Sequence, residues 1–249
     1  MTMAQWIQGT VVDNIHWTEN LFSLTLDAAV DDFTAGQFTS LALDIDGERV
    51  ARPYSYLNSP GQRPLEFFCY TATDGLLSNM LVKLDSGDQV WIKQQSTGFF
   101  VLKEIPAADE LWMLGTGTGI APYLSILNTT EPWDRFQHIV LVQAVRTQAD
   151  LRYQELIETF SSNHPEQFSF QAYVSREQVP GTITGRVPTS IEDGSLEESV
   201  GRQLNTEVSQ IMLCGNPDMV KDTVEVLKGR GFRKHRRRTP GHITVENFW

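Results

Sequence analysis

The first hundred residues alternate short apolar segments with turns that are rich in Gly, Pro and Asp. The segments are IQGTVV, LFSLTL, GQFTSLALDIDG, VARPYSYLN, LEFFCYTA and DQVWIK. Strands separated by turns at this spacing predict an antiparallel barrel or sandwich. We expect one helix here, over residues 76–84, with Ser78 as its N-cap and Gly87 just past its end.

From Glu110 onward, apolar strands alternate with helices. The strands are LWMLGT, HIVLVQAV, FSFQAYVS and IMLCG, and the helices are IAPYLSILNT, ADLRYQELIETF and PDMVKDTVEVLKG. Buried strands alternating with helices predict a parallel sheet that is covered on both faces. Pro106 and a small polar run lie between the two patterns. We therefore expect two domains, an antiparallel β-barrel at residues 1–103 and a parallel α/β domain at residues 104–249.

Length and composition fit two soluble domains. The chain has 249 residues, of which 41% are hydrophobic and 20% charged. No stretch approaches the ~18 apolar residues of a membrane helix, and the N-terminus lacks the pattern of a secretion signal. We expect a cytoplasmic protein that does not enter a membrane. Cys69 and Cys214 are too few for a disulfide framework, a thiolate zinc site or an iron–sulfur cluster, so we expect an organic redox cofactor and no metal.

The charge is unevenly distributed. A formal net charge of −11 argues against nucleic-acid binding. Yet seven of the twenty basic residues fall between positions 228 and 238: Lys228, Arg230, Arg233, Lys234, Arg236, Arg237 and Arg238. This basic segment is either a solvated connection between a helix and a strand or a docking patch for an acidic macromolecule.

The loop Gly115–Gly119 lies between an apolar strand and a helix that contains Pro122 in its first turn. Backbone N–H groups at such a helix start favour a pyrophosphate, and glycines let it come close. The loop is not the G-x-G-x-x-G fingerprint, because Ile120 stands where that spacing has glycine. A tight turn without a ligand also explains it.

Three arginines follow the ends of predicted strands. Arg146 follows the second strand of the α/β region, Arg176 follows the third after Ser175, and Arg186 lies in the next loop. One such arginine would be an ordinary surface charge. Three guanidiniums and a hydroxyl at the carboxyl ends of parallel strands favour a 2'-phosphate site, because Arg binds phosphate in a bidentate fork.

Two further segments have both a structural and a ligand-binding interpretation. Asn216 and Pro217 suit an N-cap and the first position of a helix, and they follow a strand whose end faces the expected ligand crevice. Residues 52–56, RPYSY, put a cation, aromatic rings and a hydroxyl on one strand. Residues 75–78, GLLS, open a helix that could receive a second pyrophosphate.

Taken together, RPYSY, GLLS, GTGTGIAP and CGNPDM occur in an order that resembles the ferredoxin-NADP reductase family. The resemblance spans nearly the whole chain. It implies an FAD-binding barrel, an NADP-binding α/β domain, and electron transfer between NADPH and ferredoxin or flavodoxin through FAD. The acidic electron carrier would then be the partner of the basic segment.

The resemblance also implies roles for individual residues. Arg52 would bind the FAD pyrophosphate, Tyr54 would lie against the isoalloxazine, and Ser55 would hydrogen-bond its reactive nitrogen. Further FAD contacts are expected at Pro53, Phe67, Leu76, Leu77, Ser78 and Thr118. The NADP contacts are expected at Val145, Arg146, Ser175, Arg176, Arg186, Asn216, Pro217, Asp218 and Asp222.

The catalytic residues implied by the resemblance are Ser55, Cys214 and Glu246. Ser55 and Cys214 would shape the nicotinamide pocket, and Glu246 would pair with the nicotinamide or relay protons. Cys214 as a small buried residue is an equally good interpretation. A final strand through Ile243 and Val245 leads to the last two residues. By the resemblance, Phe248 matches a terminal Tyr that covers the flavin in plastid members. Trp249 resembles a bacterial extension whose aromatic ring stacks on the adenine of FAD.

Two other functions are compatible with the sequence. One is an NADPH-dependent free-flavin reductase or a stand-alone oxygenase reductase. The other is a nucleotide-binding interaction module without turnover. A bound flavin that NADPH bleaches would exclude the module, and comparing flavodoxin with free FMN as acceptor would separate the two enzymes.

Overall fold

The computed structural model describes residues 5–247, and these divide into two compact units. The first unit runs to Val101 and also includes Ala121–Thr129. The second contains Leu102–Ile120 and the chain from Thr130 onward. The helix after the glycine-rich loop thus packs with the first unit, although the loop belongs to the second.

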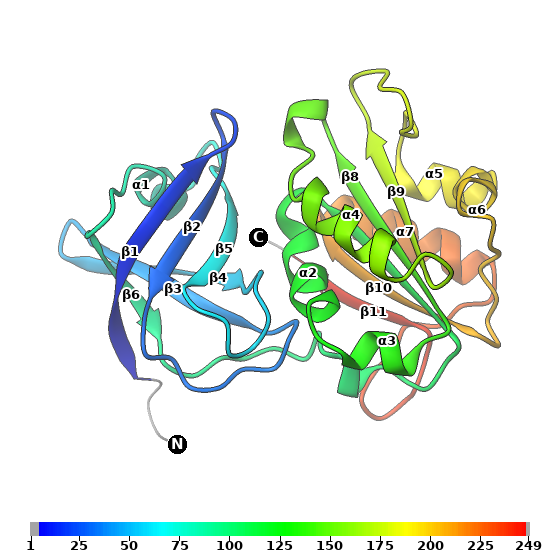
Figure 1. Ribbon diagram of the computed structural model, residues 1–249, viewed down its shortest axis with the longest axis horizontal. Coiled ribbons are helices and arrows are strands. Elements are labelled where there is room, and N and C mark those ends of the chain that lie inside the picture. The colour runs from blue at the N-terminus through cyan, green and yellow to red at the C-terminus, as the bar shows by residue number, and fades with distance from the viewer. Residues whose placement is uncertain (1–4, 248–249) are drawn as a thin grey trace. The chain divides into compact units, whose positions relative to one another are not determined.

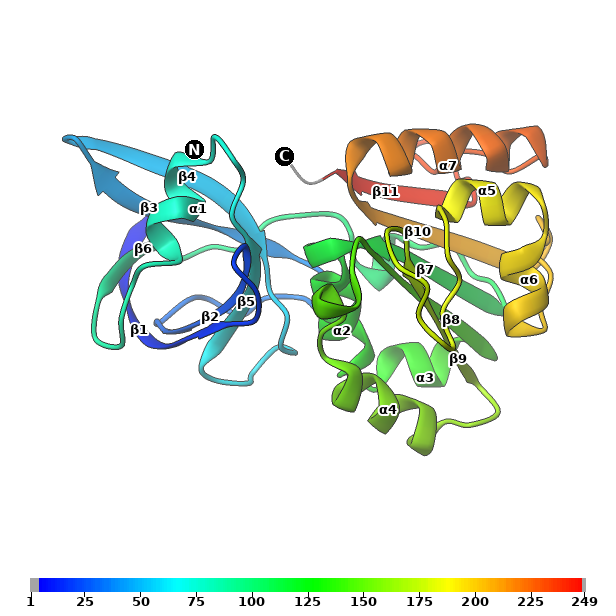
Figure 2. The same ribbon diagram turned by 90° about the horizontal axis from the view of Figure 1, so that it is seen from above.

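The first unit is an antiparallel sheet. Its strands are β1 (Trp6–His16), β2 (Leu21–Asp27), β3 (Phe38–Ile45), β4 (Glu48–Ser55), β5 (Leu65–Tyr70) and β6 (Gln89–Lys93). They pair in the order β4-β3-β6-β1-β2-β5, and Figure 2 shows them curling around a common interior. Fully buried side chains such as Phe22, Leu24, Leu41 and Ile92 fill that interior. The predicted antiparallel barrel architecture is confirmed.

Helix α1 (Leu76–Leu81) begins at the predicted residue, but its N-cap is Gly75. Ser78 lies inside the first turn, where its Oγ donates to the Gly75 carbonyl at 3.2 Å and accepts from the Ala72 N–H at 3.2 Å. The prediction of Ser78 as the N-cap was therefore wrong. Its hydroxyl bonds backward to the loop that precedes the helix.

The same helix ends three residues earlier than predicted. The Asn14 side chain on β1 donates to the carbonyls of Leu81, Val82 and Leu84 at 2.9–3.2 Å. These bonds give donors to carbonyls that would otherwise have none at a helix end. Asn14 thereby attaches the end of α1 to the barrel wall.

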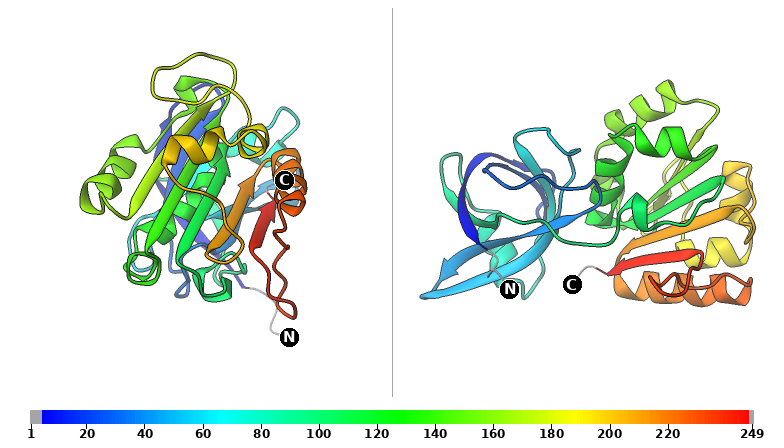
Figure 3. Two further views of the ribbon diagram at one scale, coloured as in Figure 1. Left: turned by 90° about the vertical axis from the view of Figure 1, so that its right-hand side faces the viewer. Right: turned by 90° about the horizontal axis from the view of Figure 1, so that it is seen from below.

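The second unit is a five-stranded parallel sheet, which confirms the predicted α/β fold. Its strands are β7 (Glu110–Thr116), β8 (His138–Val145), β9 (Phe168–Val174), β10 (Ser209–Gly215) and β11 (Ile243–Asn247). They pair in the order β11-β10-β7-β8-β9, and Figures 1 and 3 show β11 beside β10 at one edge. The final strand predicted through Ile243 and Val245 is β11.

Helices cover both faces of this sheet, as expected. The helices after the glycine-rich loop are α2 (Ala121–Leu127), α3 (Glu131–Arg135), α4 (Gln154–Asn163), α5 (Val187–Glu192), α6 (Ser195–Val200) and α7 (Pro217–Gly229), and 3-10 turns span Leu102–Glu104 (η1), Gly117–Ile120 (η2) and Gln148–Asp150 (η3). Figure 2 shows α5 and α7 on one side of the sheet and α3 and α4 on the other. The sequence pattern did not predict α5 and α6.

Helix α4 begins five residues later than the predicted helix. Thr147 and Asp150 form a reciprocal capping box around η3, and Tyr153 then adopts a left-handed conformation with φ of 64°. A left-handed residue cannot continue a right-handed helix. The first continuous turn therefore starts at Gln154.

Candidate functional site

Strand β4 carries the first four of the RPYSY residues, Arg52–Ser55, and Tyr56 follows its end. Arg52 is exposed and its Nη1 donates to the carbonyl of Ala51 at 2.8 Å. Pro53 is exposed, and Tyr54 is half-buried. Burial raises the pKa of Tyr54 well above its ordinary value, so its phenol stays neutral. The strand thus presents a cation and a neutral aromatic ring.

Ser55 is the last residue of this strand, and its hydroxyl is buried without a hydrogen-bond partner among the described residues. Leaving a buried polar group unpaired costs about 1–3 kcal/mol, and such groups in folded proteins point to a missing ligand or water. A hydrogen-bonding atom of a ligand held against β4 would satisfy Ser55.

Phe67 and Leu77, both predicted to contact FAD, lie in the barrel core. The ring centroid of Phe67 is 5.3 Å from that of Tyr56, which in turn stacks on Phe33 at 3.9 Å. Phe67 is fully buried, so the structure accounts for it by core packing. Leu77 can reach a ligand only through its backbone.

The start of α1 offers backbone donors. The first N–H groups of any helix lack acceptors within the helix, and here they belong to Leu76, Leu77 and Ser78. A Cβ at Gly75 would lie 2.5 Å from the Ser78 Oγ, so only glycine fits there. Gly75 and the first turn of α1 therefore present these backbone donors.

In the second unit, the glycine-rich loop packs directly onto the end of β10. A Cβ at Gly119 would lie 2.7 Å from the Cys214 carbonyl oxygen. A Cβ at Gly215, whose φ is 125°, would collide with Thr116. The glycines bring the two backbones together at the carboxyl edge of the sheet, where Thr118 is half-buried.

Cys214 and Glu246 are register partners on β10 and β11 at this edge. The Glu246 Oε2 is buried and has no hydrogen-bond partner among the described residues, and burial raises the pKa of Glu246 to about 7. Burial, and then the charge of Glu246, raise the pKa of the Cys214 thiol, which stays protonated. The pair places a carboxyl that titrates near neutral pH beside a neutral thiol, and such a carboxyl can exchange protons.

Four of the predicted 2'-phosphate residues, Val145, Arg146, Ser175 and Arg176, are hydrogen-bonded through their backbones at the ends of β8 and β9. The Ser175 N–H donates to the Val145 carbonyl at 3.0 Å, and the Arg176 N–H donates to the Arg146 carbonyl at 2.9 Å. Arg186 is the residue before α5. The three arginines are exposed and form no ion pair with any residue that the structure describes. Their guanidiniums are available to an anion.

Asn216 caps α7, as predicted. Its side-chain oxygen accepts from the N–H groups of Asp218 and Met219 at 2.9 and 3.3 Å, and Pro217 follows at the first helical position. The Asn216 N–H donates to the Oγ1 of Thr116 at 2.8 Å. Thr116 was not singled out from the sequence, although a hydroxyl at the last position of β7 was a usable signal. Asp218 and Asp222 are exposed on α7.

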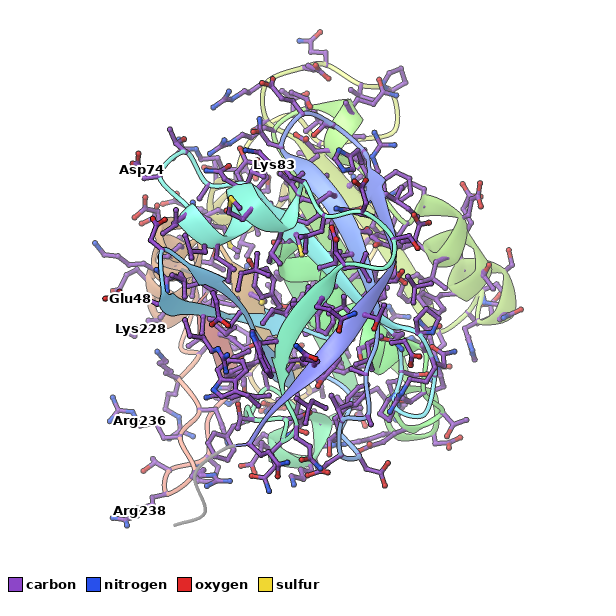
Figure 4. All side chains as sticks on the ribbon, turned by 90° about the vertical axis from the view of Figure 1, so that its left-hand side faces the viewer. Glu48, Asp74, Lys83, Lys228, Arg236 and Arg238 are labelled. Carbon is purple, nitrogen blue, oxygen red and sulfur yellow. The ribbon has the colours of Figure 1, made fainter. Side chains whose placement is uncertain are left out.

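The basic segment is a turn rather than a uniform patch of free charges. Arg236 and Thr239 exchange two backbone hydrogen bonds of 3.0 and 2.8 Å, which close a tight turn. Figure 4 shows Arg236 and Arg238 pointing away from the ribbon. Four of its cations, Arg233, Lys234, Arg236 and Arg238, are exposed and form no ion pair within the described chain.

The other three cations of the segment are engaged. Lys228 pairs with Glu225 at 2.9 Å and Arg237 with Glu104 at 3.1 Å. Arg230 makes two hydrogen bonds of 2.6 and 2.8 Å to the buried carboxylate of Glu197. Arg230 is therefore a structural residue and not part of an available docking surface.

Phe248 and Trp249 lie outside the described residues, so their predicted contacts with FAD are not placed here. The described strand β11 ends level with Gly215, at the carboxyl edge of the sheet. Across residues 5–247, no helix is long and apolar enough to cross a bilayer. No cluster of three His, Cys, Asp or Glu residues in that range could hold a metal ion.

Family models match both units. Residues 10–100 match the oxidoreductase FAD-binding domain, and residues 113–225 match the oxidoreductase NAD-binding domain. The two matches cover the β4 site and the carboxyl edge of the parallel sheet.

Similar proteins match over their full length. The chain is 50% identical to flavodoxin/ferredoxin–NADP reductase of Escherichia coli over 248 residues, covering 99% of this chain and 100% of the relative. It is 32% identical to ferredoxin–NADP reductase of Azotobacter vinelandii over 241 residues, 93% of each chain. A crystal structure of a ferredoxin NADP+ reductase from Neisseria gonorrhoeae with bound FAD and NADP is similar to the chain, with a TM-score of 0.93 at 31% identity. The match covers 99% of this chain and 100% of the other.

Proposed function

Because the chain belongs to the flavodoxin/ferredoxin–NADP reductase family, it transfers electrons between NADPH and ferredoxin or flavodoxin through FAD, and we propose the residues that serve each step. FAD, when bound, exchanges hydride with the nicotinamide and single electrons with the carrier. The protein supplies binding, orientation and proton exchange.

The buried hydroxyl of Ser55, which has no hydrogen-bond partner within residues 5–247, is the observation that carries the FAD assignment. We propose that Ser55 hydrogen-bonds the reactive ring nitrogen of the flavin. The position suits this role, because the neighbouring Tyr54 offers a neutral aromatic ring that can lie against the isoalloxazine. Both residues lie on one strand, β4, and its pairing with β3 holds their backbones in place.

The remaining FAD contacts are proposed around these two residues. Arg52 forms no ion pair among the described residues and would neutralise the pyrophosphate, with Pro53 beside it. The backbone donors of Leu76–Ser78 would hold the phosphates. Thr118 is proposed as a further FAD contact, as the family resemblance implies. Phe248 and Trp249 would stack on the FAD rings, as the family resemblance implies.

We propose that Arg146, Arg176 and Arg186 bind the NADP 2'-phosphate, together with the hydroxyl of Ser175 and the adjacent backbone of Val145. The support is that Arg146 and Arg176 follow two neighbouring strands whose ends are joined by backbone hydrogen bonds, and that Arg186 precedes α5. All three are exposed and form no ion pair within residues 5–247. A phosphate dianion in a bidentate fork neutralises such a cluster.

The nicotinamide end of NADP would reach the opposite part of the carboxyl edge. There Cys214 supplies a neutral wall, and Glu246 exchanges the proton that accompanies flavin oxidation, since its pKa of about 7 lets both forms exist at neutral pH. The residues Asn216, Pro217, Asp218 and Asp222 would flank the nucleotide from the start of α7.

The acidic carrier would dock on the available part of the basic segment, Arg233, Lys234, Arg236 and Arg238. Opposite charges across an interface raise the encounter rate and are screened by salt. Arg237 is excluded from the test of this site, because its reversal would also break the pair with Glu104.

We further propose that residues 1–103 form the FAD domain and residues 104–249 the NADP domain. The family matches at residues 10–100 and 113–225 support this division, although Ala121–Thr129 pack in the first unit. The two free cysteines suit a reducing compartment and support a cytoplasmic location.

Replacing Ser55 with Ala tests the flavin assignment. The FAD-free variant should be at least as stable as the wild type, because the lost hydroxyl has no partner in the described chain. In the FAD-bound variant, stopped-flow reduction by NADPH should slow about tenfold, the loss of roughly one hydrogen bond in the transition state.

Ser125→Ala is the matched control. Its buried Oγ donates to the Asn58 carbonyl at 2.8 Å, so this variant should lose thermal stability and keep its rate of reduction. If Ser55→Ala instead destabilised the FAD-free protein as Ser125→Ala does and reduced FAD at the normal rate, Ser55 would be a structural residue.

A further inference from the structure

Glu177 joins the two loops that carry the proposed phosphate-binding arginines. It follows Arg176 directly, and its Oε2 accepts a hydrogen bond of 2.8 Å from the backbone N–H of Gln148. Gln148 lies two residues after Arg146, in the loop that follows β8. The side chain therefore spans from the loop after β9 to the loop after β8.

This bond continues the ladder between the two strands. Beyond the strands, the last backbone rungs run from Ser175 to Val145 and from Arg176 to Arg146. The Glu177 carboxylate supplies the next rung, where a side-chain oxygen replaces a backbone carbonyl. Without it, the two backbone rungs would be the remaining bonds among the described residues that join this loop to the loop after β9. The bonds within the loop, such as those between Thr147 and Asp150, would remain.

The same residue also contacts the segment of the third arginine. The Glu177 carbonyl accepts from the Oγ1 of Thr184 at 3.4 Å, and Thr184 lies two residues before Arg186. One residue thus connects the segments of all three arginines. Holding these backbones together reduces the backbone freedom of the loops that a phosphate would otherwise have to restrict when it binds.

We propose that Glu177 is a positioning residue for NADP(H) selectivity, which holds the Arg146 loop against the Arg176 loop so that both guanidiniums face one 2'-phosphate. This inference rests on the proposed 2'-phosphate site. Glu177 itself does not touch the nucleotide, since its carboxylate would repel a phosphate.

Charge and position predict opposite effects of removing Glu177. A carboxylate among cations weakens their field, so on electrostatics alone any neutral replacement should strengthen phosphate binding. If the hydrogen bond to Gln148 matters, Glu177→Ala should weaken phosphate binding. Glu177→Gln removes the charge but keeps an oxygen that can accept the same bond, so it should bind at least as tightly as the wild type.

The experiment measures binding of 2',5'-ADP and 5'-ADP to the FAD-bound protein by calorimetry. For Glu177→Ala we expect the Kd of 2',5'-ADP to rise about threefold to tenfold, the range of one net hydrogen bond. The Kd of 5'-ADP, which lacks the 2'-phosphate, should stay unchanged. Glu177→Gln should restore binding of 2',5'-ADP.

Glu158→Ala is the matched control for deleting one exposed carboxylate. Glu158 lies on α4 and shows no side-chain hydrogen bond or ion pair within residues 5–247, so both dissociation constants should be unchanged. If Glu177→Ala bound 2',5'-ADP as tightly as Glu177→Gln, or weakened both ligands equally, the positioning role would be refuted.

Arg176→Ala separates this failure from failure of the site itself. If Arg176→Ala weakens 2',5'-ADP alone while the two Glu177 variants behave alike, the phosphate site stands and only the role of Glu177 falls. If Arg176→Ala leaves the ratio of the two constants unchanged, the 2'-phosphate site is wrong and the inference falls with it.

Discussion

Replacing Glu246 with Gln should make the stability of the protein less dependent on pH. In the folded FAD-free protein the Glu246 carboxyl keeps its proton up to a pKa of about 7, whereas in the unfolded chain it ionises near its ordinary value of 4.5. Between these two values the folded state binds more protons than the unfolded state. The free energy of unfolding must then fall as pH rises through this window.

The size of the effect follows from the two pKa values. Their difference corresponds to at most about 3 kcal/mol of lost stability once the pH is well above 7, and to none below 4.5. The cause is burial of a carboxylate that has no partner within the described residues. Glutamine has nearly the same shape and does not titrate, so Glu246→Gln should gain stability relative to the wild type as pH rises from 5 to 8.

Urea denaturation of both FAD-free proteins at pH 5, 6, 7 and 8 measures this difference. A second readout is the rate of carrier reduction, whose inflection near pH 7 should disappear in Glu246→Gln if this group exchanges the proton. A difference in stability between the two proteins that is the same at all four pH values would refute the reasoning. A direct 13C titration of the Glu246 carboxyl would then show an ordinary pKa.

Three further outcomes are expected. Arg176→Ala should lower the NADPH/NADH ratio of kcat/KM by roughly 10-fold to 100-fold, the loss of a charge-assisted hydrogen bond, and an unchanged ratio would contradict the phosphate site. Arg236→Glu/Arg238→Glu should slow reduction of flavodoxin at low ionic strength but not of ferricyanide. If the variant reduced flavodoxin as fast as the wild type does, the basic segment would be a solvated connection. Deleting Phe248 and Trp249 should weaken FAD retention and change flavin fluorescence, because stacked rings contribute ~0.5 to 1.5 kcal/mol each; unchanged affinity and fluorescence would show that the tail only ends the chain.

The elements that the sequence predicted well are those whose signals are local. Helix α7 starts at Pro217 and ends at Gly229, because the Asn216 cap, the following proline and the apolar period all point to the same register. The start of α4 was missed, since a capping box and a left-handed Tyr153 interrupt an otherwise helical pattern. Neither feature is visible in the spacing of apolar residues.

The candidate site depends on a different kind of information. The sequence located Cys214 near the end of one strand and Glu246 near the end of the chain, but only the parallel register of β10 and β11 makes them direct neighbours. Their proximity raises the pKa of the thiol further than burial alone does. Register between strands is set by packing over the whole sheet, so the spacing of residues could not predict this pair.

The sequence also could not show which cations of the basic segment are paired with distant carboxylates. A count of cations predicts one continuous docking patch, yet Arg230 and Arg237 are paired with Glu197 and Glu104, which lie 33 and 133 positions away in the sequence. Arg230 holds a carboxylate that is itself buried, so removing either partner would leave an uncompensated charge and destabilise the fold. A charge scan across the segment would therefore confuse lost stability with lost docking at Arg230. Only the cations that form no ion pair with the described residues, Arg236 and Arg238 foremost, can report on the carrier.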